Sequence, residues 1–151
     1  MEKILEVIAG GFAGALAAYL FNLLHWNQTE KRRKTEIICS NILSITDKIE
    51  DQAITYWLSV DNSRSPENKK IEISIKSLFR TQAKLIQQTS NNPNIDTQRK
   101  EKIKTTHDML FEIATGDYFE SRAKEASPSK CYKISQLSAE MRIALTEQIS
   151  L

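Results

Sequence analysis

The chain has 151 residues, which is enough for one domain of ordinary size. Its 21 lysines and arginines against 19 aspartates and glutamates give a formal net charge of +2, and this excess lies within residues 1–34. Because nonspecific nucleic-acid binding needs many cations along one surface, the composition excludes duplex nucleic acid from the expected partners.

Residues 4–26 are almost entirely apolar, and only Glu6, Asn22 and His25 are clearly polar. A helix that rises about 1.5 Å per residue would extend this stretch to about 35 Å, and a hydrocarbon core is about 30 Å thick. The stretch therefore predicts a transmembrane helix. A cleaved signal peptide is the alternative, but its basic residues would precede the apolar stretch rather than follow it.

The residues after the apolar stretch predict the orientation of this helix. Trp26 is typical of a membrane interface, and four cations follow it, namely Lys31, Arg32, Arg33 and Lys34. Fewer positive charges precede the helix, so the positive-inside rule places the N-terminus outside and the C-terminal part in the cytoplasm. We therefore expect a single-pass membrane protein that contacts the lipid bilayer.

A ridge of small residues lies on one face of the predicted membrane helix. It contains Gly10, Ala13, Gly14 and Ala17, and helical spacing places Glu6 on the same face. Such a ridge lets two helices pack closely in lipid, which predicts a homo-oligomer. The alternative is that small residues are common in membrane helices and that Glu6 is hydrated near the outer interface. The sequence leaves both interpretations open.

After the cations the hydrophobic pattern is helical throughout. Apolar residues recur every three or four positions from Ile38 to Val60, which predicts one long amphipathic stalk helix. The polar stretch 61–70 contains a proline and predicts a turn. Further helices are predicted around residues 71–85, from Asp96 or Thr97 to a C-terminal cap at Gly116, and from Ser127-Pro128 through Leu145.

These elements predict an all-α protein, in which one N-terminal transmembrane helix precedes a small cytoplasmic bundle of about four helices. The predicted divisions are residues 1–29 for the N-terminal tail and transmembrane helix, 30–60 for the basic juxtamembrane segment and stalk helix, and 61–151 for the remaining helical domain.

The sequence holds no motif that predicts an enzyme, so we expect no catalytic residue and no cofactor. Cys39, Cys131, His25 and His107 do not have the spacing of a metal site, and His107 is interpreted as an ordinary surface or boundary residue. The two cysteines are expected to remain reduced thiols. The carboxylates among residues 47–51 are interpreted as a solvated helix face.

The strongest candidate for a ligand site is the segment of residues 114–133, which combines a helix start with aromatic and basic residues. The predicted ligand-binding residues are Tyr118, Arg122, Lys130, Tyr132 and Lys133. The helix N-terminus and the cations would bind phosphate, and an aromatic ring would stack on a base. The alternative is structural, with Phe119 and Tyr132 filling the end of the bundle and the cations solvated.

The order of elements, with "EKRRK" after the apolar stretch and "ATGDYFESRA" in the helical domain, resembles small bacterial membrane effectors of antiphage defence. The resemblance is greatest to the membrane-associated effectors of type III CRISPR systems that sense cyclic oligoadenylate. It implies a location in the bacterial inner (cell) membrane, a cyclic nucleotide as the signal and perturbation of the membrane as the response. The alternative is a passive anchor or scaffold that docks a cytoplasmic partner, with Ile45 and Ile49 at the contact.

Overall fold

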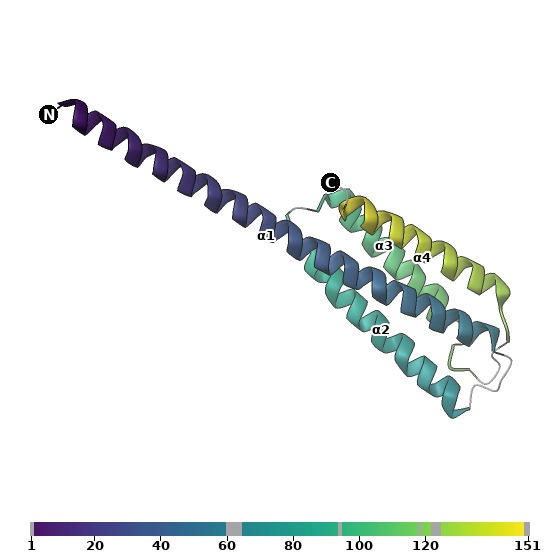
Figure 1. Ribbon diagram of the computed structural model, residues 1–151. Helices are drawn as coiled ribbons and strands as arrows, with labels where there is room; N and C mark the ends of the chain where they lie inside the picture. Colours follow the sequence, from purple (N-terminus) through teal and green to yellow (C-terminus); the bar gives the residue numbers. More distant parts are fainter. Residues whose placement is uncertain (1, 60–64, 94, 118, 122–124, 150–151) are drawn as a thin grey trace. The chain divides into compact units, whose positions relative to one another are not determined.

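The structure of the protein is a computed structural model in which the chain divides into two compact units, residues 1–34 and residues 35–151. It describes the backbone of residues 2–59, 65–93, 95–117, 119–121 and 125–149, and the side chains of the same residues except 2–13 and 147–149. Every regular element in these ranges is an α-helix (Figure 1). The prediction of an all-α protein is therefore confirmed.

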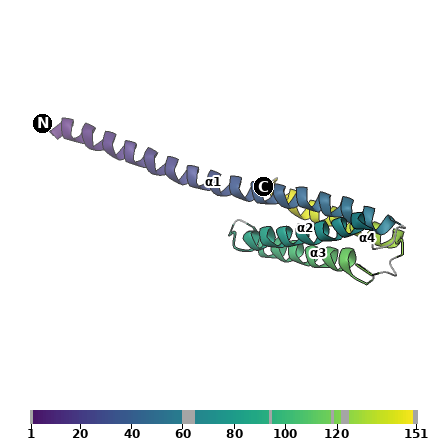
Figure 2. The same cartoon turned by 90° about the horizontal axis from the view of Figure 1, so that it is seen from below.

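Four helices make up the described chain: α1 (Glu2–Leu58), α2 (Pro66–Ser90), α3 (Thr97–Thr115) and α4 (Pro128–Ile149). The first unit consists of the N-terminal part of α1. The second unit is a four-helix bundle of residues 35–58 of α1 with α2, α3 and α4, which lie side by side in both views (Figure 1 and Figure 2).

The first unit corrects the prediction of a membrane protein. A span needs about 20 predominantly apolar residues in one helix. Among the described residues, no helix combines the length and the apolar character that crossing a membrane requires. The predicted transmembrane helix and the single-pass inner-membrane location, with the N-terminus outside, are therefore wrong. Side chains 4–13 of the predicted span lie outside the described residues.

Local side-chain contacts determine where α2 and α3 begin. The Ser65 side chain caps α2 by accepting a hydrogen bond of 3.1 Å from the backbone N–H of Asn68, and Pro66 occupies the first turn. Asp96 caps α3 by accepting from the backbone N–H groups of the second and third residues after it. Because of the Ser65 cap, α2 begins inside the stretch 61–70 that the sequence predicted as a turn.

Gly116 ends α3, as predicted, but for a different physical reason than the usual left-handed cap. Its backbone is extended, with φ of −79° and ψ of 174°, and its N–H donates to the carbonyl of Glu112 at 2.7 Å. A Cβ atom at this position would lie 2.4 Å from that same carbonyl oxygen. Glycine is therefore required by a close approach of backbone to backbone, and the positive φ angles of this connection fall on Asp117 and Glu120 instead.

The bundle holds two apolar clusters, one toward each of its ends. The first cluster contains Ile49, Ala53, Tyr56, Trp57, Ile75, Phe79, Leu110, Ala114, Cys131, Ile134 and Leu137. The second cluster contains Cys39, Ile42, Ile86, Ile103, Met141, Ala144 and Leu145. All four helices contribute to both clusters, so burial of these side chains holds the helices together.

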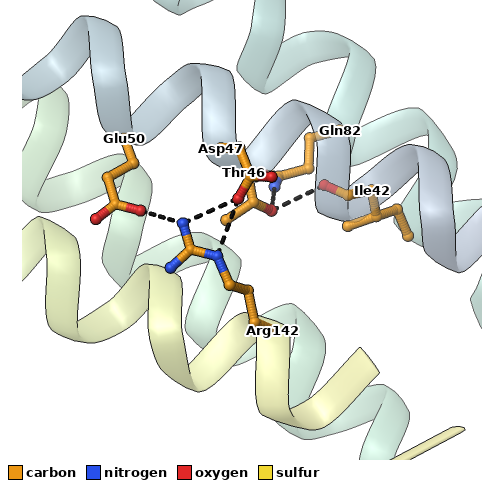
Figure 3. Close-up of polar contacts among 6 residues, drawn as sticks. All are labelled: Ile42, Thr46, Asp47, Glu50, Gln82 and Arg142. Carbon is orange, nitrogen blue, oxygen red and sulfur yellow. Dashed lines mark hydrogen bonds and ion pairs between the residues drawn. The ribbon is translucent and has the colours of Figure 1, made fainter. Parts of the chain in front are cut away.

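A layer of buried polar side chains separates the two clusters. Each helix supplies buried polar residues where its apolar face passes from one cluster to the other, among them Thr46 in α1, Gln82 in α2, His107 in α3 and Ser138 in α4. Gln82 Nε2 donates to Thr46 Oγ1 at 2.8 Å, and Thr46 Oγ1 donates to the carbonyl of Ile42 at 2.8 Å (Figure 3). We call Thr46, Gln82, His107 and Ser138 the polar layer.

Beside this layer, Arg142 joins α4 to α1. Its guanidinium contacts the carboxylates of Asp47, at 2.9 Å, and Glu50 (Figure 3). Desolvation lowers the pKa of Arg142, but the hydrogen bonds and coulombic attraction of Glu50 and Asp47 together outweigh it, so the pKa is raised. The carboxylates among residues 47–51, interpreted above as solvated, therefore include two that form interhelical ion pairs.

Candidate functional site

Lys130, one of the predicted ligand-binding residues, is engaged in contacts within the protein. Its Nζ lies 3.0 Å from a carboxylate oxygen of Asp117 and donates to the carbonyl of Gly116 at 3.2 Å. The same ammonium group lies 3.7 Å from the centre of the Trp57 ring, in the geometry of a cation–π contact. These contacts tie the start of α4 to the end of α3 and to α1.

The end of α1 also holds the connection between α3 and α4. Trp57 Nε1 donates to the carbonyl of Ala114 at 3.0 Å, and the Trp57 carbonyl accepts from the backbone N–H of Ser127 at 2.9 Å. The Tyr56 hydroxyl donates to Glu72 at 2.9 Å and accepts from the backbone N–H of Glu120 at 3.0 Å. Desolvation raises the pKa of Tyr56 well above its ordinary value, so this hydroxyl stays protonated. The contacts described here give the connection a structural role.

The other residues of the predicted ligand site are not gathered around one pocket in the described part of the chain. Tyr118 and Arg122 lie outside the described residues. Tyr132 is 74% exposed and Lys133 is exposed on α4, whereas Lys130 packs on Trp57. Ligand binding by this set stays a prediction without geometric support from these three residues.

The residues predicted to pack or flank a membrane helix belong to the first unit. Glu6, Gly10 and Ala13 have side chains outside the described residues, whereas Gly14 and Ala17 are exposed, and a Cβ atom at Gly14 would meet nothing within 4 Å. Exposed side chains also occur at Trp26, Lys31, Arg32, Arg33 and Lys34. Lys34 lies 3.5 Å from Glu30, which is an ordinary pair one helical turn apart.

The bundle carries a groove between α2 and α3 that the sequence analysis missed. It has a volume of about 380 Å³ and is open to solvent along one side. Its lining comes from two neighbouring helices: Lys76, Phe79, Arg80 and Ala83 from α2, and His107, Asp108 and Phe111 from α3. We call it the α2–α3 groove.

Aromatic rings form the apolar part of the α2–α3 groove. The buried Phe79 ring contacts the Phe111 ring edge to face, at 5.2 Å between centres and an interplanar angle of 87°. Phe111 remains 45% exposed, and Ala83 leaves room beside the rings because its side chain is small. An exposed aromatic ring held in place by a buried one provides a surface on which a planar ligand can stack.

Charged groups surround these rings. Arg80 and Lys76 lie one helical turn apart on α2, and Asp108 faces the groove from α3. Lys76 pairs with Glu120 at 2.7 Å, which offsets part of its charge. The groove therefore offers a guanidinium for an anionic group and a carboxylate for a hydrogen-bond donor, so its chemistry suits a ligand that carries both.

His107 connects the groove to the polar layer. Its Nδ1 lies 2.8 Å from Gln82 Oε1, and its ring contacts the Phe79 ring edge to face, at 5.7 Å between centres. The side chain is 9% exposed, and burial lowers the pKa of His107, an effect that Asp108 partly opposes. The imidazole is therefore neutral at pH 7, with one nitrogen held inside the protein.

The described residues contain no group of three or more histidine, cysteine, aspartate or glutamate side chains that could hold a metal ion. Cys39 and Cys131 are buried free thiols in different apolar clusters, and burial raises the pKa of both. The sequence did contain a signal for the polar layer, because Gln82 interrupts the apolar spacing of α2. The groove itself had none, since it depends on which helices are neighbours.

No known protein family, no characterised protein and no solved structure matches this chain.

Proposed function

We propose that this protein is a non-enzymatic, all-α binding protein that takes up a nucleotide in the α2–α3 groove. The observation that carries this proposal is the combination, in one groove, of the exposed Phe111 ring, the Arg80 guanidinium and the hydrogen-bonding groups of His107 and Asp108. Each of these groups suits a different part of a nucleotide.

The base would stack on Phe111, because every nucleobase has a flat face and stacking on an aromatic side chain contributes about 1–3 kcal/mol. His107 lies one helical turn from Phe111 on α3, so it faces the edge of a base that is stacked there. The phosphate would bind Arg80 on the opposite wall, where a guanidinium forms charge-assisted hydrogen bonds with phosphate oxygens.

Other features of the groove agree with a ligand of this size and polarity. The volume of about 380 Å³ falls in the range of small-molecule sites, which is roughly 300–1,000 Å³. Asp108 would repel a purely anionic ligand, whereas it can accept a hydrogen bond from an amino group or a hydroxyl. A nucleotide therefore suits the groove better than inorganic phosphate does.

The resemblance to effectors of type III CRISPR antiphage defence indicates which nucleotides deserve testing first. We propose that the ligand is a signalling nucleotide, with cyclic mononucleotides and cyclic oligoadenylate as the first candidates. Under this proposal the protein receives a signal and passes it on through a change in its assembly. A longer cyclic nucleotide would place one adenylate unit in the groove and extend beyond its open side.

Calorimetric titration of the full chain tests this function. The ligands are AMP, cyclic AMP, a cyclic oligoadenylate and, as a control, inorganic phosphate. Arg80→Gln should weaken binding by roughly tenfold to a hundredfold, because a hydrogen bond to a charged group contributes about 1.5–3 kcal/mol. The matched control is Lys84→Gln, which removes an exposed charge from the same helix outside the groove and should leave affinity unchanged.

Two results of this titration would overturn the function. If no nucleotide gives a heat of binding at concentrations up to the millimolar range, the groove is excluded as a nucleotide site. Equal weakening by Arg80→Gln and Lys84→Gln would show that only general charge attraction is measured. A Phe111→Ala variant adds a second check. Loss of the stacking ring should weaken the binding of nucleotides but should leave the binding of inorganic phosphate unchanged.

A second candidate function is self-association through the first unit, and we propose a second copy of this chain as the partner. Large apolar side chains of α1 are 49–70% exposed there: Leu16, Tyr19, Leu20, Phe21, Leu23, Leu24 and Trp26. They cover a wider part of the helix than the apolar stripe of an ordinary surface helix. Residues 14–29 hold no lysine, arginine, aspartate or glutamate, so nothing repels an identical segment.

Light scattering on the full chain tests this association. The wild type should be larger than a monomer, and the double change Leu20→Glu, Leu24→Glu should dissociate it, because buried carboxylates without partners are costly. Ile73→Glu is the control, since it places a new charge on an exposed position of α2. A monomeric wild type, or an oligomer that survives the double change, would exclude this surface.

The docking surface named in the sequence analysis is not available for this purpose. Ile49 is fully buried in the first apolar cluster, and Ile45 packs against the same cluster. Both side chains therefore pack in the interior of the bundle. Their replacement by aspartate would unfold the bundle rather than release a partner.

A further inference from the structure

The hydrogen bonds of the polar layer run in one direction only. The series that runs from His107 through Gln82 and Thr46 ends at the carbonyl of Ile42, which can accept a hydrogen bond but cannot donate one. Thr46 Oγ1 lies 2.8 Å from this oxygen and therefore donates its proton to it (Figure 3). Having used its proton, the Thr46 hydroxyl can only accept from the next group in the series, which is Gln82.

The donor and acceptor roles of Gln82 and His107 follow from that of Thr46. The Gln82 atom 2.8 Å from Thr46 must be the amide nitrogen, because the hydroxyl can only accept there. The other end of the same amide, Oε1, then faces His107 Nδ1 at 2.8 Å and can only accept. A neutral imidazole carries one proton, so that proton resides on Nδ1 and the remaining nitrogen, Nε2, has none.

We infer that His107 offers its bare Nε2 to the α2–α3 groove as a hydrogen-bond acceptor, and that Thr46 and Gln82 are the positioning residues that impose this state. The inference rests on the proposed function, because it assigns the ligand group that meets His107. That group must donate a hydrogen bond, as the exocyclic amino group of an adenine base does. A base that presents only acceptors at this edge would face a lone pair and be rejected.

The surroundings of His107 support the same assignment. Phe79 packs against the imidazole, with 69° between the ring planes, which holds the ring in its orientation. Asp108 also lines the groove and is a second acceptor for donors of the ligand. Burial lowers the pKa of His107, so the neutral form on which the argument depends is the one present at pH 7.

An acceptor that a bound ligand must match is a strong basis for discrimination. A site built around a hydrogen bond rejects an analogue without the required group, because its own polar atom then stays unpaired. The groove should therefore distinguish AMP from purine riboside monophosphate. These two probes share the phosphate, the ribose and the flat ring, and they differ in the exocyclic amino group.

The first arm of the test measures the proton on His107 directly. Nitrogen-15 NMR of the full chain, labelled at histidine, distinguishes a protonated from a bare ring nitrogen, and the spectrum of His107→Gln assigns the signals. At pH 7 we expect Nδ1 to be protonated and Nε2 to be bare. A protonated Nε2 in the wild type would overturn the inference, whatever ligand the groove binds.

Variants of the polar layer test whether Thr46 and Gln82 impose this state. Thr46→Val removes the acceptor for the Gln82 amide, so the amide can reverse and the proton of His107 should move partly to Nε2. Thr81→Val is the control, because its hydroxyl bonds only to its own helix, at the carbonyl of Ser77. An unchanged tautomer in folded Thr46→Val would contradict the role of Thr46, and the wild-type spectrum remains decisive if this variant does not fold.

The second arm measures binding of the two probes. AMP should bind at least about tenfold more tightly than purine riboside monophosphate, which corresponds to about 1.4 kcal/mol. Equal affinities would overturn the assignment of a donor group to the ligand. If neither probe binds, the proposed nucleotide function fails, and the NMR arm still decides separately whether His107 presents a bare Nε2.

Discussion

Replacing Gln82 by leucine removes the central member of the polar layer. The change eliminates two hydrogen bonds of 2.8 Å each, one to Thr46 and one to His107. Thr46 keeps its bond to the carbonyl of Ile42, so it loses only the hydrogen bond that it accepts. The Nδ1–H group of His107 is left without its partner inside the bundle.

The cost of this change follows from the two lost contacts. Each hydrogen bond contributes about 1 kcal/mol net, and a buried donor left unpaired costs about 1–3 kcal/mol. The leucine side chain returns part of this through apolar burial, at about 25 cal/mol per Å². We therefore expect Gln82→Leu to lower the free energy of unfolding by about 2–3 kcal/mol. A second change, His107→Phe, should restore part of the loss because it removes the unpaired donor.

Urea unfolding of the full chain, followed by far-UV circular dichroism, measures this difference as a shift in midpoint at constant slope. Gln87→Leu is the matched control, because it makes the same substitution at an exposed position of α2 and should change stability little. A Gln82→Leu variant as stable as the wild type would show that the hydrogen bonds of the polar layer contribute nothing. A double variant no more stable than Gln82→Leu would show that His107 is not left unpaired.

Three further predictions concern other parts of the bundle. Gly116→Ala should cost about 1–3 kcal/mol in urea unfolding, because the new Cβ would lie 2.4 Å from the Glu112 carbonyl oxygen; an unaffected variant would contradict the close approach. Trp57→Phe should cost about 1–2 kcal/mol in the same assay, through loss of the bond to Ala114 and a weaker contact with Lys130, and a neutral result would exclude this role. His107 should make the wild type less stable as the pH falls below about 6.5, because burial lowers its pKa when folded and the unfolded chain then binds the proton more readily. This contribution is fully present above that pH, and His107→Gln should remove that part of the pH dependence in unfolding curves between pH 5 and 8.

The helices of the bundle could be predicted because their signals are local. Apolar residues at helical spacing mark the buried faces, so Ile42, Ile49, Ala53 and Tyr56 are all fully buried in α1. The start of α3 at Thr97, after its cap Asp96, likewise falls where the sequence placed it, at Asp96 or Thr97. Such features depend on residues a few positions apart and need no knowledge of the tertiary structure.

The site could not be predicted because it depends on contacts between distant residues. Lys130 has the positive charge that a phosphate-binding residue needs, but the structure places it on Trp57 and beside Asp117. His107 has no neighbour in sequence that indicates a role, and only the packing of α3 on α2 brings it to Gln82.

The membrane prediction failed for a different reason. Composition alone does not establish a span, and among the described residues no helix is long and apolar enough to cross a membrane. The exposed apolar side chains that remain in the first unit are the basis for the proposed self-association.

The central claim is that a nucleotide binds between α2 and α3, and NMR of the full chain with added AMP tests it most directly. We predict that backbone amide signals change for residues 76–83 of α2 and 107–111 of α3, and that Arg80→Gln suppresses these changes. No change at saturating AMP, or changes confined to residues 127–133 at the start of α4, would contradict the assignment of the groove as the binding site.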